Sequence, residues 1–352
     1  ELKQNKGQYS ACTNLSELNN FIEKAIQSGT VAFDTETDSL NTLQANLVGF
    51  SLCYEKGKAI YIPLLTNEDP LFAPPLIAKK DALDLLKKLF NSSINIIMHN
   101  AKFDLEVLHS NGLDLIYGDN DANYTLYDTM IAAWILEPDK LGKSPYSLET
   151  LSEQNLGLKG IEYDQVVEKG KTFADVKIDE AAEYAAEDSD FTFQLWTHLQ
   201  EKLKKSNLWE LYTNMEMAVL PVLAKMEING IHLNSKILNE YEIQLKVELE
   251  KSEKEIYAAA GHEFNIASPK QLSTVLFEER GLKPGKKTKT GYSTDTDVLE
   301  SLRDSDIIPG LILDYRAKAK LLSTYVQTLP LLCDETERIH TTFMQTGTAT
   351  GR

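Results

Sequence analysis

The sequence predicts an α/β domain with a mixed sheet flanked by helices, followed by a mainly α-helical domain. Between residues 8 and 110, short apolar runs with strand character alternate with segments that carry apolar residues at helical spacing. From residue 128 to about residue 203 the apolar spacing is almost entirely helical. Alternating β and α segments are typical of a mixed sheet with helices packed on it.

The elements of the first part follow from periodicity and from the turn-prone residues between them. Because short turns separate the first three strands, these are expected to form an antiparallel meander. The expected elements are a helix at 15–28, strands at 30–35, 47–54 and 58–63, a helix at 81–90, a strand at 94–98 and a helix at 101–110.

The second part is expected to be helical, with breaks at its proline and glycine residues. Asp128 directly precedes a helical pattern and is expected to cap that helix. The basic, polar stretch at 204–207 predicts a domain boundary. Beyond it, a helix at 208–226 is closed by Asn229-Gly230, and a long amphipathic helix is expected at 235–261.

Composition is that of a soluble globular protein with two or three domains, since 42% of the 352 residues are hydrophobic and 25% are charged. No apolar run approaches the roughly 20 residues of a membrane span, and the N-terminus lacks the apolar core of a signal peptide. The chain begins without Met, so a piece of a longer protein is expected. Three scattered cysteines, Cys12, Cys53 and Cys333, indicate a reducing, cytoplasmic setting.

The net charge of −17 argues against a nucleic-acid partner, because phosphate contacts come from Lys and Arg. The weight of this argument is limited, since the local field matters more than the sum and metal-binding acids are part of that sum. One local basic cluster is present. It comprises Lys283, Lys286, Lys287 and Lys289, and no acidic residue occurs from Gly281 up to Asp295.

Candidate metal ligands occur at the ends of the apolar runs. Asp34 and Glu36 lie two residues apart on a strand and therefore share one face. Asp104 follows the next buried strand. Tyr184 and Asp188 are four apart on a helix and share a face as well.

Four carboxylates without His or Cys companions suit Mg²⁺ or Mn²⁺, and so dense a group of acids would repel itself without cations. Two such ions about 3.5–4 Å apart can bind the attacking and the leaving oxygen of a phosphoryl displacement. The sequence therefore predicts a two-metal site for phosphodiester hydrolysis.

These residues also carry a family resemblance. The segments 34–37, 100–104 and 184–188 resemble the three exonuclease motifs of the DnaQ-like superfamily, in its DEDDy branch. The segments 215–231, 268–272, 286–294, 315–325 and 345–352 are similar to the start of the polymerase domain, the thumb and the approach to the palm in bacterial family A DNA polymerases.

The resemblance implies a ribonuclease H-like exonuclease domain at 1–203 with a mixed five-stranded sheet. It further implies polymerase N-terminal helices and a mainly helical thumb at 204–340, and a truncated palm at 341–352. The palm and fingers are then expected beyond Arg352 and a 5′-nuclease domain upstream in the parent protein. This chain alone is not expected to polymerise.

The resemblance also implies roles for single residues. Asp34 is expected to bridge two divalent ions, with Glu36 and Asp188 on the site of the attacking water and Asp104 on the second site. Tyr184 is expected to orient that water. The 3′ end of the substrate is expected to meet Leu40, Asn100 and Tyr163, and duplex DNA is expected to meet Lys286, Lys287, Lys289, Arg316, Lys320 and Arg352.

The implied function is a proofreading 3′→5′ exodeoxyribonuclease that acts in DNA replication and repair and releases 5′-dNMP. Its partner is a primer-template, and the protein is expected to be monomeric, bacterial, cytoplasmic and nucleoid-associated. A DEDDh enzyme would place a His where Tyr184 stands, so His99 and His109 are interpreted as structural.

Two alternatives remain. A vestigial exonuclease kept as a DNA-binding scaffold would have lost metal carboxylates. A ribonuclease D-like RNA 3′ exonuclease would not carry the thumb.

Overall fold

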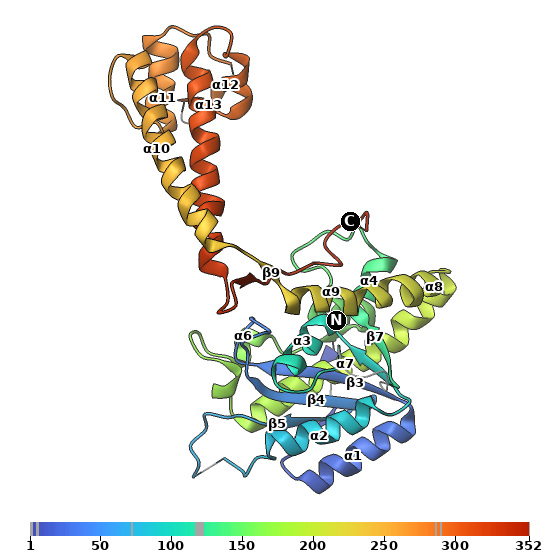
Figure 1. Cartoon of the computed structure of the whole chain (residues 1–352). Coiled ribbons are helices and arrows are strands. Elements are labelled where there is room, and N and C mark those ends of the chain that lie inside the picture. The colour runs from blue at the N-terminus through green and yellow to red at the C-terminus, as the bar shows by residue number, and fades with distance from the viewer. Residues whose placement is uncertain are drawn as a thin grey trace. The chain divides into compact units, whose positions relative to one another are not determined.

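The computed structural model describes residues 3–4, 7–71, 73–116, 123–285, 287–288 and 291–351, and the chain divides into two compact units (Figure 1). Unit 1 comprises Glu1–Ile228 together with Thr342–Arg352, and unit 2 comprises Asn229–Thr341. The C-terminal residues therefore return to the unit that carries the sheet. No helix among the described residues combines the length and the apolar character that crossing a membrane requires.

Unit 1 contains the α/β part that the sequence predicts. Its strands are β1 (Lys3–Gln4), β2 (Gln8–Ala11), β3 (Thr30–Thr37), β4 (Leu47–Glu55), β5 (Lys58–Pro63), β6 (Asn95–Met98), β7 (Thr125–Asp128) and β8 (Leu158–Lys159). Its helices are α1 (Leu15–Ser28), α2 (Lys79–Phe90), α3 (Ala101–Ser110), α4 (Thr129–Leu136), α5 (Leu148–Leu156), α6 (Tyr163–Val166), η1 (Phe173–Asp175), α7 (Ile178–Lys205), α8 (Trp209–Leu211), η2 (Tyr212–Glu216) and α9 (Met217–Asn229).

The main sheet is mixed, with strand order β2-β5-β4-β3-β6-β7. The β3-β4-β5 meander is antiparallel, as predicted, whereas β6 runs parallel to β3 and β7 parallel to β6. The predicted number of five strands is wrong, because the described part of the chain forms a main sheet of six. β2 and β7 occupy its two edges and are only four residues long, so neither shows the apolar pattern of a buried central strand.

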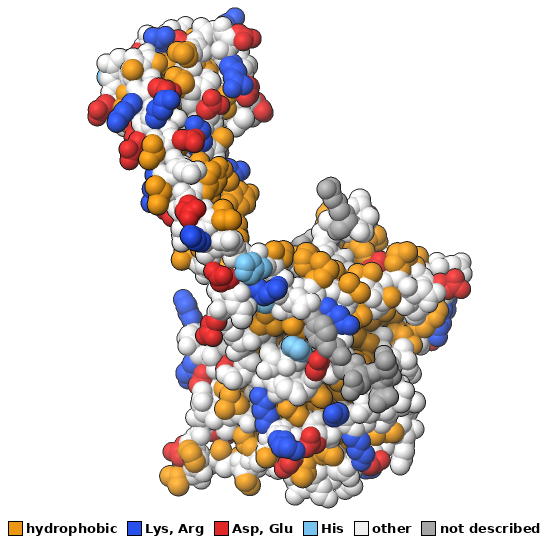
Figure 2. All heavy atoms as spheres, in the orientation of Figure 1, with side chains coloured by type: hydrophobic (Ala, Val, Ile, Leu, Met, Phe, Trp, Pro, Cys, Tyr) orange, Lys and Arg blue, Asp and Glu red, His pale blue; other side chains and the backbone are white. Residues whose placement is uncertain are grey.

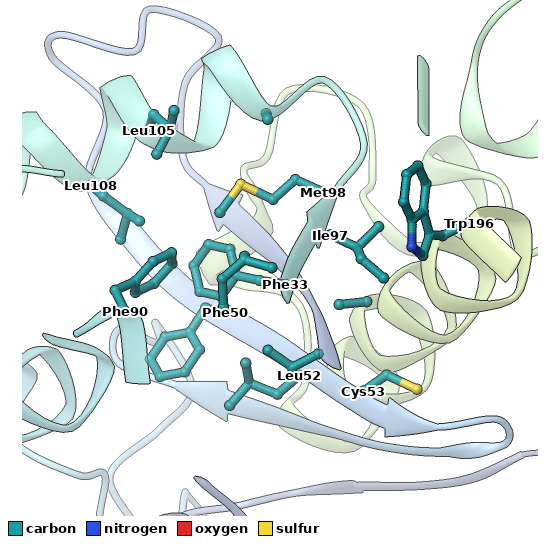
Figure 3. Packing of buried hydrophobic residues seen from close by; sticks show 14 of the residues in the cluster. Phe33, Phe50, Leu52, Cys53, Phe90, Ile97, Met98, Leu105, Leu108 and Trp196 are labelled. Carbon is teal, nitrogen blue, oxygen red and sulfur yellow. The ribbon is translucent and has the colours of Figure 1, made fainter. Parts of the chain in front are cut away.

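The core covers both faces of this sheet. Phe33 stacks on Phe50 with ring centroids 5.8 Å apart and meets Phe90 of α2 edge to face at 5.7 Å. Figure 3 shows this aromatic group beneath Leu105 of α3, whereas Trp196 of α7 lies on the side of Ile97 and Cys53. Because side chains alternate along a strand, one face of the sheet packs on α2 and α3 and the other on α7.

The boundary between the compact units lies after Ile228, whereas the predicted domain boundary lies at residues 204–207. The reason is packing: Tyr212, Leu220 and Ala224 are buried in the same core as the sheet. The Tyr212 hydroxyl also accepts a hydrogen bond from the Asp128 backbone N–H at 2.7 Å. A polar stretch at 204–207 signals the end of α7 but not the end of the core.

Unit 2 is helical. Its elements are β9 (Ile231–His232), α10 (Ser235–Ala260), α11 (Pro269–Ser273), η3 (Thr274–Glu279), β10 (Lys287–Thr288), β11 (Gly291–Tyr292), α12 (Thr296–Ser301), α13 (Ile307–Lys320), η4 (Leu321–Val326), η5 (Leu329–Leu332) and β12 (Arg338–Ile339). The long helix predicted at 235–261 is confirmed, and Gly261 ends it at a φ of 85°, a conformation that glycine adopts without strain. A separate core that includes Ile256, Leu299 and Ile312 joins α10 to its neighbours.

Candidate functional site

The centre of the candidate site is the C-terminal half of β3, a central strand of the sheet. Asp34 and Glu36 point to the same face, and their ligand oxygens lie within 4.8 Å of one another and of an Asp188 oxygen on α7. The structure thus brings together three of the four predicted metal carboxylates. They come from two elements that are far apart in sequence and pack against each other.

Asp104, the fourth predicted ligand, reaches the same strand from α3. Its Oδ1 accepts hydrogen bonds from the Thr35 backbone N–H at 3.0 Å and from the Thr35 hydroxyl at 2.6 Å. Thr35 points to the α3 side of the sheet, between two acids that point to the α7 side. Asp104 is therefore adjacent to the three-carboxylate cluster but is oriented by Thr35.

Burial shapes the electrostatics of these acids. Burial raises the pKa of Asp34 to about 7. Burial, followed by repulsion from Asp34, also raises the pKa values of Asp104 and Asp188. The pKa of Glu36 is raised by burial first and then by the charges of the three other acids. These shifts have one origin, because buried negative charges without a counter-charge favour the protonated form.

The donor set fits a divalent cation. Glu36 is only 7% exposed, and its Oε1 has no hydrogen-bond partner among the described residues. A buried polar atom without a hydrogen-bond partner costs free energy unless a bound ion or water interacts with it. All the groups that converge here are carboxylate oxygens, the ligands that Mg²⁺ and Mn²⁺ prefer.

Tyr184 stands one helical turn before Asp188 and packs among aromatic rings. Its ring lies 5.7 Å from that of Phe173 and 6.2 Å from that of Tyr163, measured between centroids. Burial first, and then the charge of Asp188, raise the pKa of the phenol above its ordinary value. The hydroxyl therefore stays protonated at neutral pH and is available as a hydrogen-bond donor at the cluster.

The three residues predicted to meet a 3′ end differ in their surroundings. Leu40 is 91% exposed, and Tyr163 is 44% exposed beside Tyr184. Asn100 precedes α3 in the left-handed conformation, at φ 64° and ψ 50°, which Asn tolerates better than most residues. Leu40 and Tyr163 therefore both offer exposed apolar surface, and that of Tyr163 lies beside Tyr184.

Asp128 caps α4, as predicted, and also holds α3. Its Oδ1 accepts from the backbone N–H groups of Met130 and Ile131 at 2.8 and 3.1 Å. Its Oδ2 accepts from the Ala101 N–H at 2.7 Å, and the Asn100 N–H lies 3.4 Å from Oδ1. One buried carboxylate thus satisfies the N-termini of two helices, one of which carries Asp104.

The two histidines near α3 make contacts of a structural kind. His99 Nδ1 lies 2.8 Å from the Thr129 hydroxyl, and burial lowers the pKa of His99 to about 4. Its ring is therefore neutral at physiological pH. His109 Nδ1 lies 3.3 Å from an Asp114 carboxylate oxygen at the far end of α3.

The predicted duplex-binding residues lie in unit 2 or at the C-terminus. Arg316 donates to the Thr294 carbonyl oxygen at 2.5 Å, so its guanidinium braces the loop at 291–295, and Lys320 is exposed at the end of α13. On the face that Figure 2 shows, basic and acidic side chains are interspersed on each unit. The side chains of the remaining predicted residues, Lys286, Lys287, Lys289 and Arg352, lie outside the described residues.

Two residues near the site were not predicted from the sequence. Thr35 orients Asp104, and its position between two motif acids on an alternating strand was an available signal. Glu149, in the first turn of α5, adds negative charge near Asp188 and Tyr184. Nothing in the sequence around Glu149 points to α7, so only the packing of α5 on α7 reveals it.

The raised pKa of Asp34 predicts a pH-dependent stability of the metal-free protein. The folded state binds this proton more tightly than the unfolded state, so the free energy of unfolding should fall as pH rises from about 4 to about 7. Denaturant titrations in EDTA across this range measure the fall, and Mg²⁺ should reduce it. Asp34→Asn is the matched control and should make the profile shallower, leaving the part that comes from the other acids with raised pKa values; an unchanged profile in this variant contradicts the assignment.

Comparisons with known proteins match two family models. Residues 9–204 match the family model described as 3′-5′ exonuclease, and residues 235–352 match the model described as DNA polymerase family A. The chain is 37% identical over 388 residues to DNA polymerase I of Treponema pallidum (strain Nichols), across 100% of this chain and 38% of that protein. It is 39% identical over 366 residues to DNA polymerase I of Rhizobium leguminosarum, across 98% of this chain and 35% of that protein.

A solved structure shares the fold. The POL domain of Pol1 from M. smegmatis, in complex with DNA primer-template and dNTP, aligns with a TM-score of 0.76 at 24% identity and covers 97% of this chain and 54% of that chain. The present chain spans well under half of the length of the curated relatives named above. It belongs to the 3′-5′ exonuclease family, in the form in which this domain is followed by a DNA polymerase family A region.

Proposed function

We propose that this chain is the 3′→5′ proofreading exonuclease and thumb portion of a DNA polymerase I-like enzyme. It would hydrolyse the 3′-terminal phosphodiester of DNA, release a 5′-dNMP and use two divalent metal ions, Mg²⁺ or Mn²⁺. The observation that carries the proposal is the cluster of buried Glu36 with half-buried Asp34 and Asp188, whose ligand oxygens lie within 4.8 Å of one another. All four predicted carboxylates are present, which favours an active site over a vestigial scaffold.

The residues divide the work by position. Asp34, Glu36 and Asp188 would hold the ion beside the attacking water, and Asp34 with Asp104 would hold the second. When bound, such ions lower the pKa of a water and stabilise charge on the leaving oxygen. Tyr184, protonated and one turn from Asp188, would orient the water by a hydrogen bond.

The substrate would be held by packing rather than by base-specific contacts. Exposed Leu40 and Tyr163, with Asn100, would receive the last nucleotides of a frayed strand. Stacking on aromatic and apolar side chains tolerates any base, as proofreading requires. The match of residues 235–352 to DNA polymerase family A favours DNA over the RNA substrate of a ribonuclease D-like enzyme.

The remaining expectations belong to the same proposal. The exonuclease domain at 1–203 would have a ribonuclease H-like arrangement, residues 204–340 would form the N-terminal helices and thumb, and residues 341–352 would begin the palm. The thumb would bind primer-template through Lys286, Lys287, Lys289, Arg316, Lys320 and Arg352. The parent protein would be a cytoplasmic, nucleoid-associated monomer.

One assay tests the proposal. The chain is incubated with a 3′-mismatched, 5′-labelled primer on its template, in Mg²⁺ and separately in EDTA. A ladder of shortened primers that appears in Mg²⁺ and is absent in EDTA supports it. The lack of any ladder in Mg²⁺ or Mn²⁺ rejects an active exonuclease, and an equal ladder on a matched RNA primer would favour the ribonuclease alternative.

Tyr184→Phe separates the phenol from the metal ligands. Loss of one hydrogen bond to a charged or polarised group is worth about 1.5–3 kcal/mol, so kcat should fall about 10- to 100-fold. The ring packing against Phe173 and Tyr163 is retained in the variant. The Mg²⁺ concentration at half-maximal rate should stay near that of the parent chain; a large shift there, with kcat unchanged, would assign Tyr184 to metal binding instead.

A further inference from the structure

The segment that follows unit 2 is bound to the exonuclease unit by specific hydrogen bonds. Residues 342–352 belong to unit 1 although they come after the whole of unit 2 in the chain. Gln345 donates to the Glu216 carbonyl oxygen at 2.9 Å and to its carboxylate at 2.7 Å. Farther along, the Trp134 indole N–H donates to the Thr348 carbonyl oxygen at 3.1 Å.

The segment also binds to both members of a buried ion pair. Lys102 of α3 pairs with Glu227 of α9, and the two side chains are 12% and 7% exposed. Both then bind the backbone of Phe343: the Lys102 ammonium donates to its carbonyl oxygen at 2.6 Å, and its N–H donates to Glu227 Oε1 at 2.6 Å. The backbone of residue 343 therefore adds one acceptor for Lys102 and one donor for Glu227 to this pair.

Lys102 and Asp104 work on different sides of α3. Residues two apart on a helix point in different directions, so Asp104 faces Thr35 of the sheet while Lys102 faces Glu227 and Phe343. The helix is thereby held between the sheet and the 342–345 segment. A shift of α3 on its outer side would move Asp104 relative to the other carboxylates.

The same outer face of α3 also reaches the loop that carries Leu40. Glu106 is four residues after Lys102 and shares its face. Glu106 Oε2 accepts from the Thr42 hydroxyl at 2.8 Å, and the charges of Glu227 and Lys102 both act on Glu106. The attachment of residue 343 is thus connected, through adjacent buried groups, to two parts of the site.

We propose that Lys102 is a positioning residue. Residues 342–345, which follow unit 2 in the chain, bind the Lys102–Glu227 pair and thereby hold α3 in place. Metal binding at the exonuclease site therefore depends on these residues. The proposal rests on the proposed function for the meaning of the site. Its geometry rests on the contacts of Lys102, Glu227 and Phe343 alone. It gives the segment after Thr341 a role in hydrolysis that is separate from any role in synthesis.

The test measures metal binding directly, without nucleic acid. Free Mn²⁺ is quantified by electron paramagnetic resonance during titration of the 352-residue chain. Lys102→Met should raise the Mn²⁺ concentration at half-saturation about tenfold, the size typical of groups that orient metal ligands. Lys102→Arg keeps the charge and the donors, and should stay within about threefold of the parent.

A matched pair on the segment shows whether docking matters. Phe343→Pro removes the N–H that donates to Glu227, whereas Phe343→Ala keeps the backbone groups and removes only the ring. The proline variant should weaken Mn²⁺ binding in the same direction as Lys102→Met, and the alanine variant should not. Equal effects of the two would overturn the backbone attachment as the cause.

A double variant guards against simple unfolding. Lys102→Met removes the positive charge beside buried Glu227, which destabilises a protein, whereas removing both charges is tolerated far better. Lys102→Met with Glu227→Met should therefore fold and still show the weakened binding. Parent-like Mn²⁺ binding in this folded double variant overturns the proposal.

Excision assays on the same variants keep the two hypotheses apart. At saturating Mn²⁺ the variants should regain a kcat close to that of the parent, because the ligands themselves are intact. If the parent chain does not cut DNA but the variants still weaken Mn²⁺ binding, the proposed function fails and the role of Lys102 stands. If the parent chain cuts DNA and the variants bind Mn²⁺ normally, the proposed function stands and the role of Lys102 is rejected.

Discussion

Replacing Asp34 by alanine is expected to lower the rate of 3′→5′ excision at least about 1000-fold. The ligand oxygens of Asp34, Glu36 and Asp188 lie within 4.8 Å of one another, and the charge of Asp34 also acts on Asp104. In the proposed function Asp34 is the ligand that both metal sites share. Metal-ion stabilisation of a transition state is worth several kcal/mol, and about 4 kcal/mol corresponds to a thousandfold in rate. Single-turnover excision of a mismatched primer measures the effect.

Folding of the Asp34→Ala variant should not suffer. Asp34 is a half-buried acid among acids, so removing it relieves repulsion in the metal-free protein. The melting temperature in EDTA should therefore equal or exceed that of the parent chain. Asp84→Ala on α2, an exposed acid paired with Lys80 and far from the cluster in sequence, is the control and should cut normally. A ladder that persists in Asp34→Ala would place the nuclease activity elsewhere or in a contaminant.

Replacing Asp128 by alanine is expected to destabilise unit 1 by about 3 kcal/mol. Asp128 is 1% exposed, and its carboxylate accepts from backbone N–H groups at the starts of both α3 and α4. Loss of a helix cap costs about 1 kcal/mol, and leaving further buried donors unsatisfied adds to that cost. Here the two costs fall on adjacent helices at once.

Tryptophan fluorescence can isolate this effect. All three tryptophans, Trp134, Trp196 and Trp209, belong to unit 1, so urea unfolding followed by their emission reports on that unit alone. Asp128→Asn retains one acceptor oxygen and should lose about half as much stability as the alanine variant. A loss below 1 kcal/mol for Asp128→Ala would show that water replaces the carboxylate. Because α3 carries Asp104, the variant should also require more Mg²⁺ for excision.

Much of the local structure was accessible from sequence. The helix at 15–28, the meander that follows it and the long helix ended by Gly261 all depend on periodicity and on capping residues within a few positions. The short edge strands β2 and β7 were missed because four residues without a continuous apolar run carry too little pattern. Compact unit 1 extends past the predicted boundary at 204–207, because Tyr212 and its neighbours pack into the same core after a polar stretch.

The sequence by itself determined the chemical equipment of this protein: the four carboxylates, the phenol one turn before Asp188 and the oxygen-only ligand set that selects a hard cation. Spacing of two on a strand and four on a helix specifies which side chains share a face, since those periods are properties of the backbone. Only the tertiary structure decided how these faces meet. It placed Asp188 against Asp34 and Glu36, tied Asp104 to Thr35 and made Asp128 the cap of two helices. It also brought residue 343 onto Lys102. Such contacts join residues far apart in the chain, and they follow from the packing of the whole core rather than from any local pattern.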